Sequence, residues 1–379
     1  MGTLHKYIFK QVFGASFLTV ALFVFVLVVG NVVKEVMGEF AAGRIDLSLF
    51  IYIIVLIIPG VIPYAMPLGM LTGILLVFGR MSAQSEIVAI KASGRSIFDI
   101  AAPVFFLAIL TSIFSVAINF YYAPAADSAY KSTLKNLIRN NPLQFIKPGV
   151  PVRDFPGYII YANSAEGKTL KDFRIWEINK NGDVNVSTRS ETAEISYNED
   201  TEEIELTMRG VSVDYRRPEN PDDLSRPAYI AKMSDAKVSL SLSQILGSYA
   251  SGKYKLTLLT FGELMKARFN WKLSPSDTPE IRYKRRIEVQ TQIQKNFAMA
   301  FSIFSMVVLA IPLGIKASRT ETFANAGIAL ALAMGYYLMT VVITWLENYP
   351  HLRPDILIWL PNLLFIILGI ILFIKASKN

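Results

Sequence analysis

Long apolar stretches alternate with polar segments along the chain, and their layout predicts the architecture. A helix needs about 20 apolar residues to cross a hydrocarbon core about 30 Å thick. Six stretches qualify: Phe13–Val33, Phe50–Phe78, Ile97–Tyr122, Phe297–Ile315, Phe323–Trp345 and Ile356–Ile374. The sequence therefore predicts three membrane spans, a long insert outside the membrane, and three more spans. The second stretch is longer than a straight span requires, so we expect it to be tilted, kinked or partly unwound.

The insert between Tyr122 and Phe297 shows a different periodicity. The run Phe173–Ile178 leads into a turn ending at Gly182, and a second short run follows, which is typical of a β-hairpin. Further on, Ile204, Leu206 and Met208 alternate with polar residues, so that they share one face of a strand. Short strands with frequent turns favour a sandwich or a jelly roll.

These patterns predict a polytopic α-helical membrane protein with an inserted all-β domain that resembles a jelly roll. We expect residues 1–122 to hold the first three spans, 123–296 the β domain with its connecting segments, and 297–379 the last three spans. The composition agrees, because 53% of the residues are hydrophobic and the mean hydropathy is +0.39. Such a chain is too apolar for most classes of soluble enzyme.

The lysines and arginines of the short loops predict the orientation, because cytoplasmic loops carry an excess of them. One side would hold Lys6, Lys10, Arg80, Lys91, Arg95, Lys316, Arg319, Lys375 and Lys378, and the other only Lys34, Arg44 and Arg353. Both termini are therefore expected in the cytoplasm and the insert outside. The insert mixes both signs of charge with no basic stripe, which argues against a nucleic-acid partner.

Catalytic motifs are mostly absent. The only histidines, His5 and His351, are expected on opposite sides of the membrane, so neither a histidine metal site nor a catalytic triad is predicted. The segment 247–253 has the spacing of a phosphate-binding loop, but Tyr254 replaces the required Ser or Thr and no buried strand precedes it. We therefore expect no bound cofactor and no ATP hydrolysis by this chain.

The second span carries Pro59, Pro63 and Pro67 at intervals of four residues. This spacing puts all three on one helix face, and each proline removes one backbone hydrogen bond. The freed carbonyls need partners on neighbouring helices or in a wet cavity. One interpretation is a hinge beside a transport path, and the other is a static kink.

The connector 81–94 between the second and third spans has helical spacing of apolar residues, with Ile87 and Ile90 among them. Glu86 lies in its first turns and Gly94 is placed to cap its end. The segment is either a helix resting on the bilayer surface or a helix that docks into a cytoplasmic protein, with Glu86 as its charged anchor.

Lys34 stands at the outer end of the first span, and Arg44 follows ten residues on. Cations there can extend to anionic headgroups, or they can simply anchor the helix at the interface. In the fifth span Gly327, Ala331 and Gly335 form a face of small residues that would let another helix approach closely.

Several of these segments resemble one family. They are Met66–Gly69, Ser85–Gly94, Arg285-Arg286 with Glu288, Ile311–Gly314 and Trp359–Asn362. Together with the three-plus-three layout and the β insert, they resemble the LptF/LptG permease subunits of the bacterial lipopolysaccharide exporter. The segment around Glu86 is the most specific of them, and no motif of the insert contributes.

The resemblance implies a transporter made of several different subunits. Two paralogous permeases form a heterodimer on a cytoplasmic ABC ATPase dimer, with a single-span accessory subunit and a periplasmic bridge protein as further partners. The transporter extracts lipopolysaccharide from the inner membrane, and ATP is bound by the partner ATPase. The resemblance gives Glu86 the contact with the ATPase and Lys34 the contact with the lipid headgroup. By position, Ile87, Ile90 and Gly94 belong to the same coupling segment, and Arg44 is a second candidate for the headgroup. The alternating Ile204, Leu206 and Met208 are the candidates for the acyl-chain path.

Two alternatives remain open at this stage. The chain would be a membrane-anchored scaffold or sensor whose β domain binds a protein, or a permease for another lipid or a lipoprotein. Copurification separates them, because a transporter half should bring an ATPase and a paralogous permease with it. The sequence does not distinguish the F-type from the G-type subunit.

Overall fold

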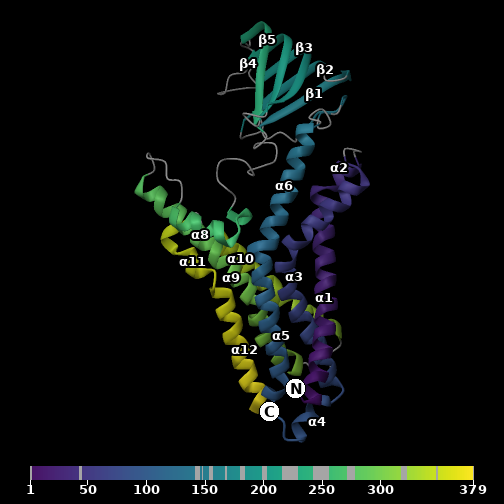
Figure 1. Cartoon of the computed structure of the whole chain (residues 1–379), viewed down its shortest axis with the longest axis vertical. Coiled ribbons are helices and arrows are strands. Elements are labelled where there is room, and N and C mark those ends of the chain that lie inside the picture. The colour runs from purple at the N-terminus through teal and green to yellow at the C-terminus, as the bar shows by residue number, and fades with distance from the viewer. Residues whose placement is uncertain are drawn as a thin grey trace, which may run out of the picture. The chain divides into compact units, whose positions relative to one another are not determined.

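The fold consists of two compact units in a computed structural model (Figure 1). One unit comprises Met1–Tyr130 with Leu256–Asn379, and the other Lys131–Lys255. The structure describes residues 2–41, 45–140, 146, 148–152, 157–166, 169–179, 184–198, 203–215, 229–241, 256–270, 278–316, 322–346 and 349–378. We refer to the two parts as the helical unit and the sheet unit.

Six helices of the described chain are long and apolar enough to cross a membrane, which confirms the predicted spans. They lie at Thr3–Val33, Leu47–Ala83, Ile97–Thr133, Pro279–Lys316, Gly327–Trp345 and Pro354–Ala376. The main helix of each span is α1 (Thr3–Glu35), α3 (Leu47–Ala83), α5 (Ile97–Ala117), α9 (Pro279–Lys316), α10 (Thr322–Trp345) and α12 (Leu360–Lys378) in turn. A π-helical turn, η1 (Ile118–Tyr122), joins α5 to α6 (Ala123–Asn140).

Short helices complete the helical unit: α2 (Met37–Ala41), α4 (Glu86–Ala92), η3 (Leu256–Leu258), α8 (Phe261–Asn270), η5 (Pro350–Leu352) and α11 (Pro354–Leu357). Both chain ends and α4 lie at one end of this unit, and α2, α8 and α11 lie at the other (Figure 1). The unit is built around α9, because 78% of its most apolar window is buried against 22–39% for the other five spans. The other spans leave most of the residues in their apolar windows unburied within the described chain.

The sheet unit holds one antiparallel sheet whose strands follow chain order. They are β1 (Tyr158–Glu166), β2 (Thr169–Ile178), β3 (Val184–Asn198), β4 (Glu203–Tyr215) and β5 (Tyr229–Ser241). The predicted hairpin is confirmed, because β2 pairs with β3 from Thr169↔Glu194 to Ile178↔Val184. The predicted alternation is confirmed as well, since Ile204, Leu206 and Met208 are buried between more exposed neighbours.

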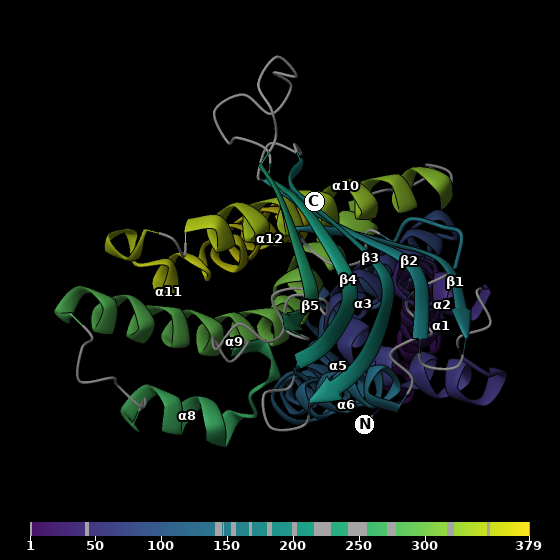
Figure 2. The ribbon, with the colours of Figure 1, turned by 90° about the horizontal axis from the view of Figure 1, so that it is seen from above.

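One row of residues across the sheet takes no part in the pairing of any of the four strand pairs. The row contains Asn163, Asp172, Glu191, Gly210 and Ser234, one from each strand, and pairing is regular on both sides of it. Asp172 and Gly210 have positive φ angles of 47° and 63°, a region that suits glycine and, less often, aspartate. We call this unpaired row of residues the crease. Figure 2 shows how strongly the strands curve.

The crease shifts the alternation of buried and exposed positions along each strand by one residue. The buried side chains before and after it therefore still point to the same face of the sheet. On β4, Met208 and Val211 are both buried although three positions apart, and Leu170 and Phe173 on β2 behave alike. All four belong to one core cluster with Ile160, Ala193 and Ile195. The unpaired row thus lets the strands keep their apolar side chains on one face of the sheet on both sides of the crease.

The inserted β domain is therefore confirmed, although the described strands do not close into the expected sandwich or jelly roll. The five described strands, of 9 to 15 residues, form one open sheet in meander order. The frequent turns of the sequence predicted strands correctly and gave no information on closure.

Candidate coupling and lipid-contact sites

The predicted docking helix is present as α4, shorter than the connector 81–94 in which it lies. Ser85 precedes it with a left-handed φ of 61°, and Gly94 follows it with a φ of 84°. The amide of Gly94 donates to the Lys91 carbonyl and that of Arg95 to the Ile90 carbonyl. This pair of bonds is a Schellman motif, so Gly94 ends the helix as its position in the sequence indicates.

Glu86 is half-buried in the first turn of α4. The Tyr7 hydroxyl of α1 donates to its carboxylate, with 3.1 Å between Tyr7 Oη and Glu86 Oε2. The bond is exposed, and no ion pair links Glu86 to a described cation. Its negative charge therefore remains accessible to a cationic partner.

The two isoleucines of α4 face the bundle. Ile87 is only 3% exposed and belongs to the main core cluster, and Ile90 packs against that cluster. The exposed apolar side chain of α4 is Val88, at 65%. In this conformation Ile87 and Ile90 attach α4 to the helical unit, so any coupling role of theirs would act through that attachment. Val88 is the apolar side chain available to a partner, and the sequence did not single it out.

Two side-chain bonds tie the α4 region to other helices. Arg80, at the end of α3, donates to the Gln11 amide oxygen of α1. The Ser82 hydroxyl donates to the Ile315 carbonyl of α9 at 2.8 Å. A displacement of α4 would therefore act on α1, α3 and α9 together.

Lys34, one of the two predicted headgroup residues, lies at the end of the helical unit opposite α4. Lys34 occupies the last turn of α1, which ends at Glu35. Arg44 is outside the described residues, and so is the segment 247–253 with its phosphate-loop spacing. Within the described ranges, no group of three His, Cys, Asp or Glu side chains is placed to hold a metal ion.

The three prolines of the predicted hinge lie inside one continuous helix, α3, of 37 residues. Pro63 and Pro67 are buried, and Pro59 is partly exposed. Beside them the Tyr337 hydroxyl of α10 donates to the Tyr64 carbonyl at 2.6 Å. The helix is not unwound at the prolines, and α10 contacts α3 through this bond, at the residue next to Pro63. Whether the prolines act as a hinge stays a prediction.

Close packing of α1 on α3 was not predicted from the sequence. A Cβ at Gly69 would lie 2.6 Å from the Val20 Cα, and one at Gly73 would lie 2.6 Å from the Ser16 Cα. The Thr19 hydroxyl donates to the Gly69 carbonyl across the same contact at 2.7 Å. By contrast, Gly327 and Gly335, which the small-residue pattern singled out, have no neighbour within 4 Å of an added Cβ.

A buried polar cluster joins three spans and was also missed. Asn362 of α12 is 1% exposed and donates to the Ala298 carbonyl of α9 at 2.9 Å. Its side-chain oxygen accepts from the Ser305 hydroxyl at 3.1 Å and from the Tyr336 hydroxyl of α10 at 3.2 Å. The sequence signal was Asn362 itself, a polar residue in an apolar stretch, which needs internal partners in a membrane.

The three residues of the predicted acyl-chain path are buried in the sheet unit. Leu206 and Met208 are 0% exposed and Ile204 is 1% exposed, all within one core cluster. They share the apolar face of the sheet with Val211 and Val213. In the conformation described the face is closed, so a lipid could enter only after the side chains that cover it had moved.

Comparison with known proteins gives the family. The family model for the lipopolysaccharide export system permease LptF/LptG matches residues 6–375, which spans both the helical unit and the sheet unit. The chain belongs to the LptF/LptG family. One curated member of this family, the lipopolysaccharide export system permease protein LptG of Haemophilus influenzae, is 24% identical over 212 residues. That alignment covers 56% of this chain and 58% of the relative's length.

Membership in the LptF/LptG family fits the six apolar helices and the inserted sheet. The family match runs through α4 and through the end of α1, where Glu86 and Lys34 lie. The roles of individual residues come from the resemblance and from their positions in the fold.

Proposed function

We propose that this chain is a permease subunit of an ABC transporter that extracts lipopolysaccharide from the inner membrane and passes it to a periplasmic bridge. The observation that carries the proposal is the family match over residues 6–375, which leaves neither unit of the fold outside it. In this proposal a paralogous permease completes the membrane part. A single-span accessory subunit completes the inner-membrane assembly.

The cytoplasmic side holds the energy source. The excess of lysines and arginines in the loops supports a cytoplasmic location for both termini and α4, and a periplasmic location for the sheet unit. A partner ABC ATPase dimer binds ATP and contacts α4. Glu86 offers the ATPase an accessible carboxylate, and Val88 an exposed apolar side chain beside it.

The contacts of α4 with other helices explain how a movement of the ATPase would be transmitted to the lipid site. Ile87 anchors α4 in the core of the helical unit, and Ser82 links the same region to the end of α9. α1 joins at Tyr7 and carries Lys34 in its last turn, at the opposite end of the unit. A rigid movement of α1 would therefore displace the headgroup contact while α4 moves with the ATPase.

A cover for the acyl chains is the physical requirement on the periplasmic side. Burial contributes about 0.8 kcal/mol per CH₂ group, so leaving one long acyl chain in water would cost on the order of 10 kcal/mol. The curved apolar face around Leu206 offers such a cover when it opens. β5 is the last strand of the described sheet, and pairing of strand edges with the bridge protein would continue the path.

The function is tested by purifying the tagged chain from its native membranes and assaying the preparation for ATP hydrolysis. We expect a second permease of the same layout and an ATPase to copurify, with hydrolysis that rises when lipopolysaccharide is added. Recovery of the chain alone, with no ATPase activity, would support the scaffold or sensor function instead. Stimulation by another lipid and not by lipopolysaccharide would reassign the substrate.

Charge reversal at Lys34 tests the headgroup contact. Lys34→Asp should reduce photo-crosslinking of lipopolysaccharide to the end of α1 by at least about tenfold, because it replaces attraction with repulsion at a phosphate. Lys34→Arg keeps the charge and should retain most of the crosslinking. Equal yields from the two variants would show that Lys34 only anchors α1 at the interface.

Photo-crosslinkers on the two faces of β4 test the acyl-chain path. A crosslinker at Leu206 should give lipid adducts that depend on ATP, because this buried position is reached only when the apolar face opens. A crosslinker at Glu205, on the opposite face, is the matched control and should give few adducts. The lipid path would be wrong if neither Leu206 nor either face of Val211–Tyr215 gave adducts.

A further inference from the structure

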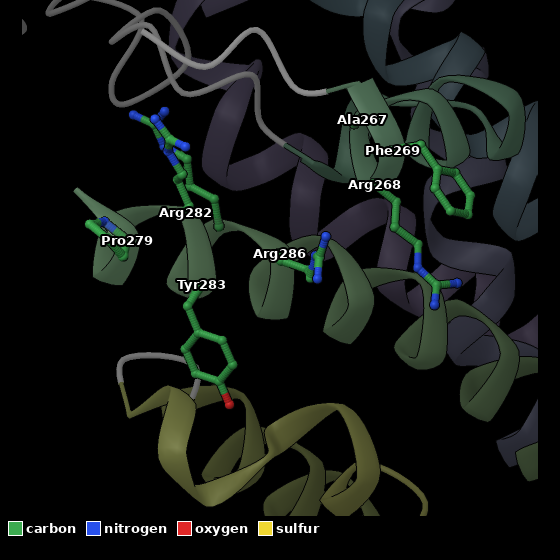
Figure 3. A pocket seen from close by; sticks show the side chains of 8 residues that line it. Ala267, Arg268, Phe269, Pro279, Arg282, Tyr283 and Arg286 are labelled. Carbon is green, nitrogen blue, oxygen red and sulfur yellow. The ribbon is translucent and has the colours of Figure 1, made fainter. Parts of the chain in front are cut away.

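An arginine-lined pocket lies between α8 and the first turns of α9, apart from all the sites described above. It has a volume of about 450 Å³, within the range that suits a small ligand. Its polar lining comes from Arg268 of α8 and from Arg282, Arg285 and Arg286 of α9, as Figure 3 shows for the three that it labels. We call it the α8–α9 arginine pocket.

Three of the four arginines, Arg268, Arg282 and Arg286, form no ion pair with an acidic side chain of the described residues. The neighbouring Arg353 differs, because it binds the Asp355 carboxylate at 3.0 Å. Several guanidinium groups around one pocket repel each other unless an anion joins them, and guanidinium groups bind phosphate oxygens in bidentate fashion.

The pocket lies beside the start of a membrane span. The Tyr283 ring stacks on the His351 ring with 6.2 Å between their centroids, and in Figure 3 it points toward the C-terminal segment. His351 lies shortly before Pro354, where the last span begins. The Trp359 indole also donates to the Gln294 amide oxygen at 2.9 Å, which holds that span against α9. These contacts place the pocket near the level of the lipid headgroups.

Exposed apolar side chains accompany the arginines. Phe269 is 72% exposed, and Tyr283 and Ile281 are each 42% exposed. The Arg268 guanidinium lies over the Phe269 ring, 5.5 Å from its centroid. Apolar and aromatic groups beside cations are typical of the membrane interface, and they favour a lipid over a soluble anion or an acidic peptide.

We propose that the α8–α9 arginine pocket binds the phosphate group of an anionic lipid headgroup at the membrane surface farthest from the chain termini. The proposal requires only that the helical unit spans a bilayer, so it is independent of lipopolysaccharide export. Two lipids offer this chemistry, a phospholipid of the bilayer and a phosphorylated glycolipid that is the transported substrate.

The test measures binding of fluorescent dioctanoyl phosphatidic acid to the full chain in detergent. Phosphatidylcholine with the same acyl chains is the control lipid, because its choline group balances the negative charge of the phosphate. Each of Arg282→Ala and Arg286→Ala should weaken phosphatidic acid binding about tenfold through the lost charge-assisted bonds. The affinity of Arg286→Lys for phosphatidic acid should lie between those of Arg286→Ala and the native protein. Lysine keeps the positive charge but cannot form the two parallel hydrogen bonds of a guanidinium group.

Arg95→Ala is the matched control variant, since Arg95 is an exposed arginine at the other end of the helical unit. It should leave binding unchanged, and thermal unfolding should show all variants folded. Displacement by lipid A better than by phosphatidic acid would identify the transported lipid as the ligand, and the reverse order a bilayer phospholipid. The proposal is overturned if the alanine variants bind normally, if phosphatidylcholine binds equally well, or if inorganic phosphate or an acidic peptide displaces the lipid at equal concentration.

Discussion

Replacing Glu86 with lysine is expected to abolish export while the protein remains folded and inserted. Glu86 is accessible on α4, and its one described side-chain bond is the exposed contact with the Tyr7 hydroxyl. A lysine would set two cations against each other if the ATPase presents a basic group, and binding should weaken at least about tenfold. The measurements are recovery of the ATPase with the purified chain and growth complementation.

Tyr7→Phe is the control that separates docking from internal structure. It removes the hydroxyl that donates to Glu86 and leaves the carboxylate in place. If Glu86 serves the partner, Tyr7→Phe should retain nearly normal ATPase recovery, while Glu86→Lys loses it and Glu86→Gln lies between. Wild-type recovery and growth in Glu86→Lys would rule out the docking function, and equal losses in Tyr7→Phe and Glu86→Lys would point to a structural bond instead.

The helical architecture was predictable because it depends on a local property. The predicted third span starts at Ile97 and the fifth ends at Trp345, where the helices of the structure start and end. Length and apolarity suffice for that, since the bilayer supplies the surroundings. The expected irregularity of the second span is different, because prolines that remove hydrogen bonds can still be held in a helix by packing on α1 and α10.

Contacts between distant segments account for most of what the sequence did not show. Ile87 had the spacing of an interface residue, but whether its face turns to the core or to a partner depends on α1 and α3. Asn362 was visible only as an odd polar residue, because its partners Ser305 and Tyr336 lie on other helices. The crease had a local sign in Gly210, yet its alignment with Asp172 on β2 depends on strand register.

Small residues illustrate the same limit. The pattern of Gly327, Ala331 and Gly335 is a valid sign of close helix packing, but no neighbour approaches either glycine. Gly69 and Gly73, four residues apart on α3, are the glycines that α1 approaches most closely. A spacing of four shows that two glycines share a face, and only the fold shows which helix meets that face.

Adding a single methyl group at Gly69 is therefore expected to destabilise the helical unit. Alanine is the better helix former by about 1 kcal/mol, so a substitution in open space would stabilise α3. At Gly69 the new Cβ would lie 2.6 Å from the Val20 Cα, closer than side chains tolerate, and α1 would have to move away. Overpacking of this kind costs about 1–3 kcal/mol, and it also stretches the Thr19 bond to the Gly69 carbonyl.

Gly60→Ala is the matched control, because Gly60 belongs to the same helix and has no neighbour within 4 Å of an added Cβ. Thermal unfolding of the purified protein in detergent should give shifts of opposite sign, a higher Tm for Gly60→Ala and a lower one for Gly69→Ala. Gly73→Ala should behave like Gly69→Ala, since Ser16 faces it at the same distance. Because α1 carries both Tyr7 and Lys34, loosening this contact should also lower export, and a Gly69→Ala protein as stable as Gly60→Ala would show that α1 does not pack on α3 in this way.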